Sequence, residues 1–246
     1  EVLGRVEREH ELRRAIEERQ LQLYYQPQLD MRSGRIVGAE ALVRWNHPAR
    51  GMILPAQFIE FAEECGLIDA IGQWVLDTAC TQLVAWRAEG PALEYVSGNV
   101  SPRQFPAEGF AKSVAATLQA HGAPPNALHL EITETAVLGN EGAAGANLES
   151  LTALGTPLEL DDFGTGYSSL AHLRHLPVAA VKLDRAFISS IHHDGNALEV
   201  ARAAIDMAHA LGKLVVAEGV EVDEQVKLLA NMNCDILQGY HLSAAF

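Results

Sequence analysis

The sequence predicts a single α/β barrel in which most strands are parallel and the first is antiparallel. The chain has 246 residues and a hydrophobic content of 48%, which is enough to bury one large core. Strand-like and helix-like segments alternate from about residue 93 onward, which favours a parallel sheet covered by helices. Eight strands in a chain of this length are typical of a modified TIM-type (β/α)8 barrel.

The first twenty residues predict a helix. They are almost all charged or apolar after Gly4, and Val2, Val6, Leu12 and Ile16 fall roughly along one face. Because the chain begins at Glu1 and not at methionine, we expect a helix at residues 1–20 that leads from an upstream domain. A trimmed terminus is the alternative. The barrel domain is expected at residues 21–246.

Two strands follow, at residues 21–27 and 35–45, and the turn between them contains Asp30 and Gly34. A parallel crossover needs about a dozen or more residues, so this pair must be an antiparallel hairpin. The other expected strands span residues 93–100, 128–132, 157–162, 179–184, 214–218 and 235–239. Helices are expected at about 55–66, 67–90, 107–121, 143–154, 168–175, 196–211 and 223–231.

Composition excludes several classes of function. The formal charge of −14 disfavours binding to DNA, because a phosphate backbone requires a basic face. We find neither a stretch of about 18 apolar residues nor a signal peptide, so no membrane contact is expected from this segment. The three cysteines are scattered and fit a reducing cytoplasm, in a free protein or in the cytoplasmic part of a larger, membrane-bound one. Neither a P-loop nor a GxSxG motif is present.

Polar residues stand at or near the carboxyl end of every expected strand, where barrel enzymes place their chemistry. They are Gln26, Glu40, Arg44, Asn99, Glu131, Glu134, Asp161, Asp162, Lys182, Asp184, Glu218, Glu221 and Gln238. Each alone has a structural alternative, such as a buried ion pair of Glu40 or Arg44, or a turn held by Asn99. So many carboxylates and amides together would be costly to bury without a cation.

The stretch 161–170, DDFGTGYSSL, looks like a site loop. Strand neighbours point to opposite faces, so Asp161 and Asp162 can reach one metal cluster only if the chain bends, and Gly164 and Gly166 can supply that bend. The alternative is a turn followed by a helix capped by Ser168 or Ser169. All the candidate ligands are oxygen donors, which favours Mg²⁺ or Mn²⁺ over Zn²⁺. The histidines lie elsewhere, and we do not expect them to bind metal.

A series of segments resembles the successive motifs of the EAL domain family, whose members are cyclic di-GMP phosphodiesterases. The resemblance covers about residues 21–243. The segments are YQPQ at 25–28, EALVRW at 40–45, NVS at 99–101, EITE at 131–134, the stretch 161–170, VKLD at 181–184, AEGVE at 217–221 and QGY at 238–240.

The resemblance implies hydrolysis of cyclic di-GMP to linear 5′-pGpG with two Mg²⁺ or Mn²⁺ ions, with Ca²⁺ inhibitory. It also implies a homodimer and an upstream sensory or GGDEF-type domain. It assigns Lys182, Glu218 and Glu134 to catalysis, with Glu134 anchoring the loop after Asp162 and a simple cap as its alternative. The implied metal ligands are Glu40, Asn99, Glu131, Asp161 and Asp162. Gln26, Arg44 and Gln238 would bind substrate or orient water, and Asp184 and Glu221 would lie in an outer shell.

Two departures from the family pattern lie near the C-terminus. Asn233 stands where a glycine is usual, and Ala244-Ala245 stands where a proline often follows. Two competing hypotheses remain. One is a catalytically silent EAL domain that senses cyclic di-GMP or binds a protein. The other is an unrelated metal-dependent barrel acting on a small phosphorylated metabolite, which would need a glycine-rich phosphate loop after the last two strands.

Overall fold

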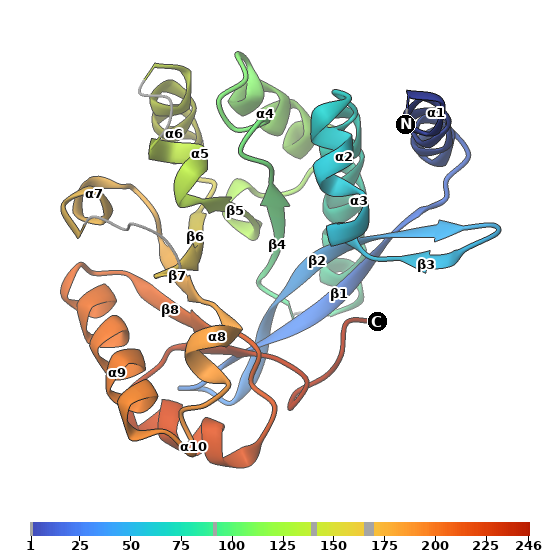
Figure 1. The fold of residues 1–246 in the computed structure, drawn as a ribbon. Helices are drawn as coiled ribbons and strands as arrows, with labels where there is room; N and C mark the ends of the chain where they lie inside the picture. The colour runs from blue at the N-terminus through green and yellow to red at the C-terminus, as the bar shows by residue number, and fades with distance from the viewer. Residues whose placement is uncertain (1, 91–92, 139–141, 165–169) are drawn as a thin grey trace.

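The computed structural model describes residues 2–90, 93–138, 142–164 and 170–246 (Figure 1). Its strands form one sheet that closes into a barrel, because β1 (Leu21–Asp30) pairs with both β2 (Arg35–His47) and the last strand. Both pairings of β1 are antiparallel, and the other barrel strands are parallel. These strands are β4 (Tyr95–Val100), β5 (Leu128–Thr133), β6 (Leu158–Phe163), β7 (Ala180–Leu183), β8 (Leu214–Ala217) and β9 (Ile236–Gln238). The predicted fold is confirmed.

A ninth strand, β3 (Gly51–Ile53), extends the hairpin beyond the barrel and was not predicted. It pairs antiparallel with the end of β2, where Trp45 lies opposite Ile53. The ring of His47 holds the turn between them, because its Nδ1 accepts hydrogen bonds from the backbone N–H groups of Ala49 and Arg50 at 3.1 Å. Three residues are too few to show the alternating pattern of a strand, so the sequence carries no clear signal for β3.

Helices surround the barrel in Figure 1. The predicted helices are present as α1 (Val2–Glu17), α2 (Ile59–Glu64), α3 (Ile68–Glu89), α4 (Phe110–His121), α6 (Ala143–Leu154), α7 (Leu170–His175), α9 (Gly195–Ala210) and α10 (Asp223–Asn231). The helix predicted at 55–66 is divided into a 3-10 turn at Pro55–Gln57 and α2. Three short helices were not predicted: the 3-10 turn at Pro125–Ala127, α5 (Glu134–Leu138) and α8 (Arg185–Ile188). One or two turns are too short to carry a helical period. Ser168 and Ser169, suggested as a helix cap, lie outside the described residues.

The first helix packs against the barrel through a narrower face than predicted. Leu12 and Ala15 are fully buried, whereas Val6 is 49% exposed. The buried side chains join a cluster with Trp45 and Phe58, between the end of β2 and the helices α2 and α3. This cluster is separate from the main core, which fills the space between the barrel and its outer helices. In the part of the chain that the structure describes, no helix is long and apolar enough to span a membrane.

The departure at Asn233 has a conformational explanation. Asn233 follows the end of α10 and has a φ of 56°, in the left-handed region that glycine usually occupies at helix C-termini. The N–H of Cys234 then bonds back to the carbonyl of Leu229 at 3.0 Å and closes the helix end. Asparagine is among the few other residues that adopt this conformation readily, so it can stand at a position that otherwise favours glycine.

Candidate active site

Lys182 on β7 lies at the centre of an acidic cluster at the carboxyl ends of the strands. Its side chain is 1% exposed. Its Nζ lies 2.7 Å from Glu218 Oε1, 3.5 Å from Glu40 Oε2 and 3.8 Å from Asp161 Oδ1, and it also contacts Glu131 Oε2. Four carboxylates from β2, β5, β6 and the residue after β8 therefore surround one ammonium group. The structure brings these five predicted residues together.

Side-chain amides bind the acidic cluster from the β1, β4 and β9 side. Asn99 Nδ2 donates to Glu40 Oε1 at 2.7 Å, and Gln238 Nε2 donates to Glu40 Oε2 and to Gln26 Oε1 at 3.0 Å. Gln28 was not predicted. It is fully buried, and its Nε2 donates to Gln238 Oε1 at 2.8 Å. Its position two residues after Gln26, on the same face of β1, is the signal that could have identified it.

A bulge in β6 sets the directions of Asp161 and Asp162. The pairing with β7 shifts between Leu160 and Phe163, so the two aspartates lie opposite the single residue Lys182. Asp162 has a φ of 55°, and its N–H donates to Asp161 Oδ1 at 2.9 Å. Bulges of this kind change the direction of side chains beside active sites. The predicted bend exists, although it begins at Asp162 itself. Gly164 has a φ of 88°, and Gly166 lies outside the described residues.

The cluster strongly shifts the pKa values of its members. Burial raises the pKa of Glu218 to about 7, with Glu40 and Asp161 adding to the rise and Lys182 opposing it. Burial and Glu40 raise the pKa of Glu131 well above its usual value, against the attraction of Lys182. Burial alone would lower the pKa of Lys182, but the carboxylates, Glu131 foremost, raise it well above the ordinary value. Lys182 is therefore held as an ammonium ion.

Contacts with groups outside this cluster are made by three other predicted site residues, Arg44, Asp184 and Glu221. Arg44 donates to the carbonyl of Val43 at 2.9 Å, and its guanidinium lies 5.7 Å from the ring of Tyr24. Asp184 caps α8 by accepting from Ala186 N at 2.8 Å. Glu221 forms an ion pair of 2.7 Å with Arg185, a residue that sequence reasoning missed. Glu134 begins α5 directly after β5. Most of the loop that it was predicted to anchor, residues 164–168, lies outside the described residues.

The donor set of the acidic cluster fits divalent cations. The described residues contain no preformed group of three or more carboxylate, imidazole or thiolate ligands for a metal, and the ammonium of Lys182 lies among the carboxylates. Four carboxylates nevertheless face one ammonium group, and Glu131 Oε1 is buried with no hydrogen-bond partner in the described part of the chain. A buried oxygen of this kind needs a ligand. Hard oxygen donors in excess of positive charge suit Mg²⁺ or Mn²⁺.

Two cavities meet at the acidic cluster. One, of about 300 Å³, extends toward Arg185, Glu221 and Tyr240. The other, of about 450 Å³, extends between β2 and the helices α2 and α3, where Ile59 and Val75 line it. Glu40, Leu42 and Asp161 line both cavities. The cluster therefore lies at the junction of a cleft with two arms.

A closed, mostly parallel barrel with acidic groups and a buried lysine at the carboxyl ends of its strands defines a protein of the (β/α)8 barrel class. The chain belongs to the EAL domain family, whose pattern matches residues 9–245. The family resemblance of the sequence is confirmed. One of its eight motif segments, residues 161–170, contains residues outside those that the structure describes.

Two relatives from Pseudomonas aeruginosa are each 42% identical to the chain. They are the bifunctional diguanylate cyclase/cyclic di-GMP phosphodiesterase MucR and the cyclic di-GMP phosphodiesterase NbdA, matched over 95% and 96% of this chain. The chain spans 34% of the length of MucR and 30% of the length of NbdA.

Solved structures show the same likeness. The PaMucR phosphodiesterase in complex with c-di-GMP superposes with a TM-score of 0.92 at 41% identity, covering 98% of this chain and 97% of that one. An EAL domain protein from Listeria monocytogenes has a TM-score of 0.84 at 32% identity, covering 97% and 93% of the two chains. The likeness thus extends over nearly the whole chain.

Proposed function

We propose that this chain hydrolyses cyclic di-GMP to linear 5′-pGpG in a reaction that depends on two Mg²⁺ or Mn²⁺ ions, and that Ca²⁺ inhibits it. The observation that carries the proposal is the acidic cluster around Lys182 at the junction of the two cavities. A cyclic dinucleotide has two nucleoside arms joined by phosphodiesters. A cleft with two arms that meet at catalytic groups suits such a substrate.

The ligands proposed for the two ions are Glu40, Asn99, Glu131, Asp161 and Asp162. The charge excess of the cluster and the buried Glu131 Oε1 support this assignment. Bound ions would activate water and stabilise the charge that develops on the phosphodiester. Asn99 and Gln238 orient Glu40 through both of its oxygens, which keeps the carboxylate directed toward the cluster.

We propose Lys182 and Glu218 as the groups that transfer protons during the reaction. With Lys182 held as an ammonium by the carboxylates, Glu218 is the group that ionises near neutral pH. Binding of cations by Glu131 and Asp161 would weaken the attraction that keeps Lys182 protonated and so lower its pKa. The ammonium could then release its proton to solvent, and the neutral Nζ could accept one from water. The 2.7 Å contact between Lys182 and Glu218 supports a shared role in this transfer.

Gln26, Arg44 and Gln238 are proposed to contact substrate or orient water. Gln26 and Gln238 line the smaller cavity, which supports their assignment. Arg44 lies on the same face of the hairpin as Glu40 and Tyr24, which supports its assignment. Asp184 and Glu221 are proposed to position α8 and Arg185 at the edge of the same cavity. Glu134 is proposed to position the segment after Asp162.

The proposal extends to the setting of the domain. MucR is named as a bifunctional diguanylate cyclase and phosphodiesterase, and this chain spans only 34% of its length. This supports an upstream GGDEF-type or sensory domain in the natural protein. We further propose that residues 1–20 connect to such a domain and that the barrel, residues 21–246, works as a homodimer in the cytoplasm, without DNA. Size-exclusion chromatography of the barrel tests the homodimer. A pulldown with the full-length protein tests for its partners, including DNA.

Incubation with cyclic di-GMP tests the reaction. Wild-type protein is mixed with the nucleotide in Mg²⁺, Mn²⁺, Ca²⁺ or excess chelator, and the linear product is measured by chromatography. We expect pGpG with Mg²⁺ or Mn²⁺, little with Ca²⁺ and none with chelator. Binding without turnover in all four conditions would instead identify a cyclic di-GMP receptor, and absence of binding would reject the substrate.

A further inference from the structure

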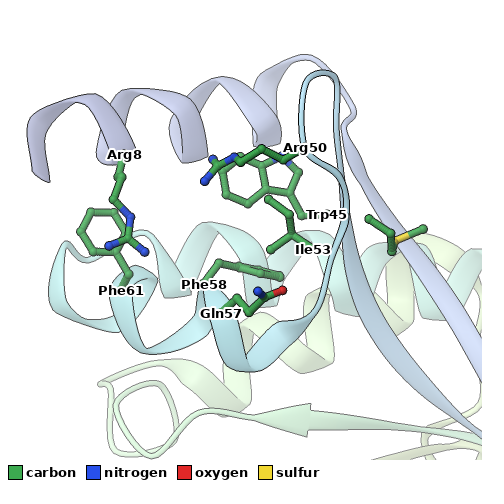
Figure 2. A pocket seen from close by; sticks show the side chains of 8 residues that line it. Arg8, Trp45, Arg50, Ile53, Gln57, Phe58 and Phe61 are labelled. Carbon is green, nitrogen blue, oxygen red and sulfur yellow. The ribbon is translucent and has the colours of Figure 1, made fainter. Parts of the chain in front are cut away.

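A separate cleft lies between the first helix and the barrel (Figure 2). Its volume is about 220 Å³, and none of its lining residues lines either cavity at the acidic cluster. Arg8 of α1 forms one side, and the β2–β3 hairpin and the α2 region form the others. The lining residues are Arg8, Trp45, Arg50, Met52, Ile53, Gln57, Phe58 and Phe61.

The charge of this cleft is opposite to that of the protein. The chain has a formal charge of −14, yet two arginines and no carboxylate line the cleft. Arg50 Nη2 is neutralised by Glu11 Oε2 at 2.6 Å. Arg8 has neither an ion pair nor a hydrogen bond within the described part of the chain, and its contact is with the ring of Phe61. Arg8 is exposed, and its guanidinium is free to contact an anion beside the cleft.

Aromatic rings form the apolar part of the cleft. The guanidinium of Arg8 lies 5.1 Å from the ring centroid of Phe61, and that of Arg50 lies 5.5 Å from the ring of Trp45. Trp45 and Phe58 meet edge to face at 5.8 Å. Figure 2 shows Arg8 and Phe61 on one side of the cleft and Trp45 and Arg50 on the other. A flat ligand can contact rings and guanidinium planes at the same time.

The free polar groups of the cleft are hydrogen-bond donors. Gln57 uses its Oε1 to accept from Leu54 N at 3.1 Å, while its Nε2 has no partner among the described residues. The amide N–H groups of Gln57 and the guanidinium of Arg8 are thus available to acceptors on a ligand. Free donors of this kind favour carboxylates over cations.

From these contacts we propose that the cleft binds a small planar aromatic carboxylate, with one or two rings among the aromatic side chains and its anionic group near Arg8 and Gln57. The volume of about 220 Å³ suits a ligand of this size. Such a ligand touches α1, the hairpin and α2 at once, so it would hold the first helix against the barrel. This proposal does not depend on the reaction at the acidic cluster.

Titration with benzoate and with naphthalene-1-carboxylate tests the proposal. The readout is the NMR resonance of the indole N–H of Trp45, which is identified by its loss in the variant Trp45→Phe. This N–H donates a hydrogen bond from Nε1 to Gln20 Oε1 at 3.1 Å, which fixes the position of the indole. We expect saturable shifts with dissociation constants of about 0.1–5 mM, as for ligands with about ten heavy atoms. Benzylammonium, benzamide and acetate should bind at least about fivefold more weakly. Equal binding of benzylammonium, or no saturable shift with either carboxylate, would overturn the proposal.

A pair of variants on α1 distinguishes binding of the anion by Arg8 in the cleft from a general effect of the protein's net charge on affinity. Arg8→Gln removes the unpaired guanidinium and should weaken naphthalene-1-carboxylate by roughly tenfold, the usual effect of a charged hydrogen-bond partner. Arg14→Gln makes the same charge change at an exposed position whose partner is Glu18, and it should bind as wild type does. Hydrogen exchange of the α1 amides is the control that both variants keep the helix docked on the barrel. In the wild type, exchange of these amides should slow when the ligand is bound. Equal affinity of the two variants would refute the role of Arg8.

Discussion

The ammonium of Lys182 and the carboxylate of Glu218 lie 2.7 Å apart at the ends of neighbouring strands. The contact joins a group whose pKa is raised well above its ordinary value to one whose pKa is raised to about 7. Both values depend on Glu40 and Asp161, which belong to the proposed metal ligands. The protonation of this pair is therefore the property that metal binding should change most.

Glu218 should make the stability of the metal-free protein fall as the pH rises. Its pKa is about 7 in the folded chain and 4.5 ordinarily, so the folded state binds more protons between these values and the slope of unfolding free energy against pH is negative. One pKa unit corresponds to about 1.4 kcal/mol, so this group would account for a loss on the order of 1–3 kcal/mol between pH 4.5 and 7.5. Urea unfolding in chelator at a series of pH values measures it.

Glu218→Gln supplies the control for that slope. The amide does not titrate, so the variant should lose less stability than wild type over the same pH range. If the two proteins show parallel pH profiles, Glu218 is not the group that ionises there.

Lys182→Met should abolish most turnover while it changes the response of the fold to metal. Loss of a positioned acid or base usually lowers the rate by about 10²–10⁴. Without the ammonium, the buried carboxylates repel one another, so metal-free stability should fall by about 3–5 kcal/mol. Mg²⁺ should then restore stability more in the variant than in wild type, as measured by melting temperature.

Lys112→Met is the matched control for Lys182→Met, because Lys112 is exposed on α4. It should retain wild-type turnover and wild-type stabilisation by Mg²⁺. Turnover in Lys182→Met equal to that of the control would remove Lys182 from the mechanism.

Three substitutions of Asp162 separate its chemistry from its backbone. Asn and Gly tolerate the φ of 55°, so Asp162→Asn and Asp162→Gly should melt near wild type, whereas Asp162→Ala should lose about 1–2 kcal/mol. All three lack the second carboxylate and should require at least about tenfold more metal for half-maximal activity. Metal titrations of turnover test this, and an unchanged metal requirement in Asp162→Asn would show that Asp162 is not a ligand.

Asn233 offers a test of the helix end that is independent of the active site. Asn233→Gly should be neutral within about 0.5 kcal/mol, because glycine adopts the φ of 56° without strain, while Asn233→Ala should cost about 1 kcal/mol. Turnover should not change in either variant. Chemical denaturation measures the difference, and equal stability of the Ala and Gly variants would contradict the conformational explanation of this departure.

The repeating strands and helices made most of the fold predictable. The hairpin of β1 and β2 followed from the short turn between them, and the carboxyl-end rule placed Glu40, Glu131, Asp161, Lys182 and Glu218 together. Short elements such as β3 and α8 carry no periodic signal, so they were missed. Gln28 was overlooked because a buried glutamine on a strand resembles a surface residue until its partner Gln238 is known.

Side-chain direction was the part of the site that the sequence could not provide. Arg44 shares a face of β2 with Glu40, as strand alternation predicts, but the sequence does not show that its guanidinium lies against Tyr24 of β1. We expected Gly164 and Gly166 to provide the bend after Asp161, whereas Asp162 itself adopts the left-handed conformation. Long flexible side chains and bulges depend on neighbours from other strands, which a single sequence does not place.

Counting bound Mn²⁺ ions tests the central claim, that the carboxylates around Lys182 form a two-metal site. Isothermal titration of chelator-treated wild-type protein with Mn²⁺, in the absence of cyclic di-GMP so that no turnover occurs, should give two ions per chain. Glu131→Gln, which removes the buried carboxylate at the centre of the cluster, should bind them at least about tenfold more weakly. Binding of no ion by the wild type, or an unchanged stoichiometry and affinity in Glu131→Gln, would contradict the account.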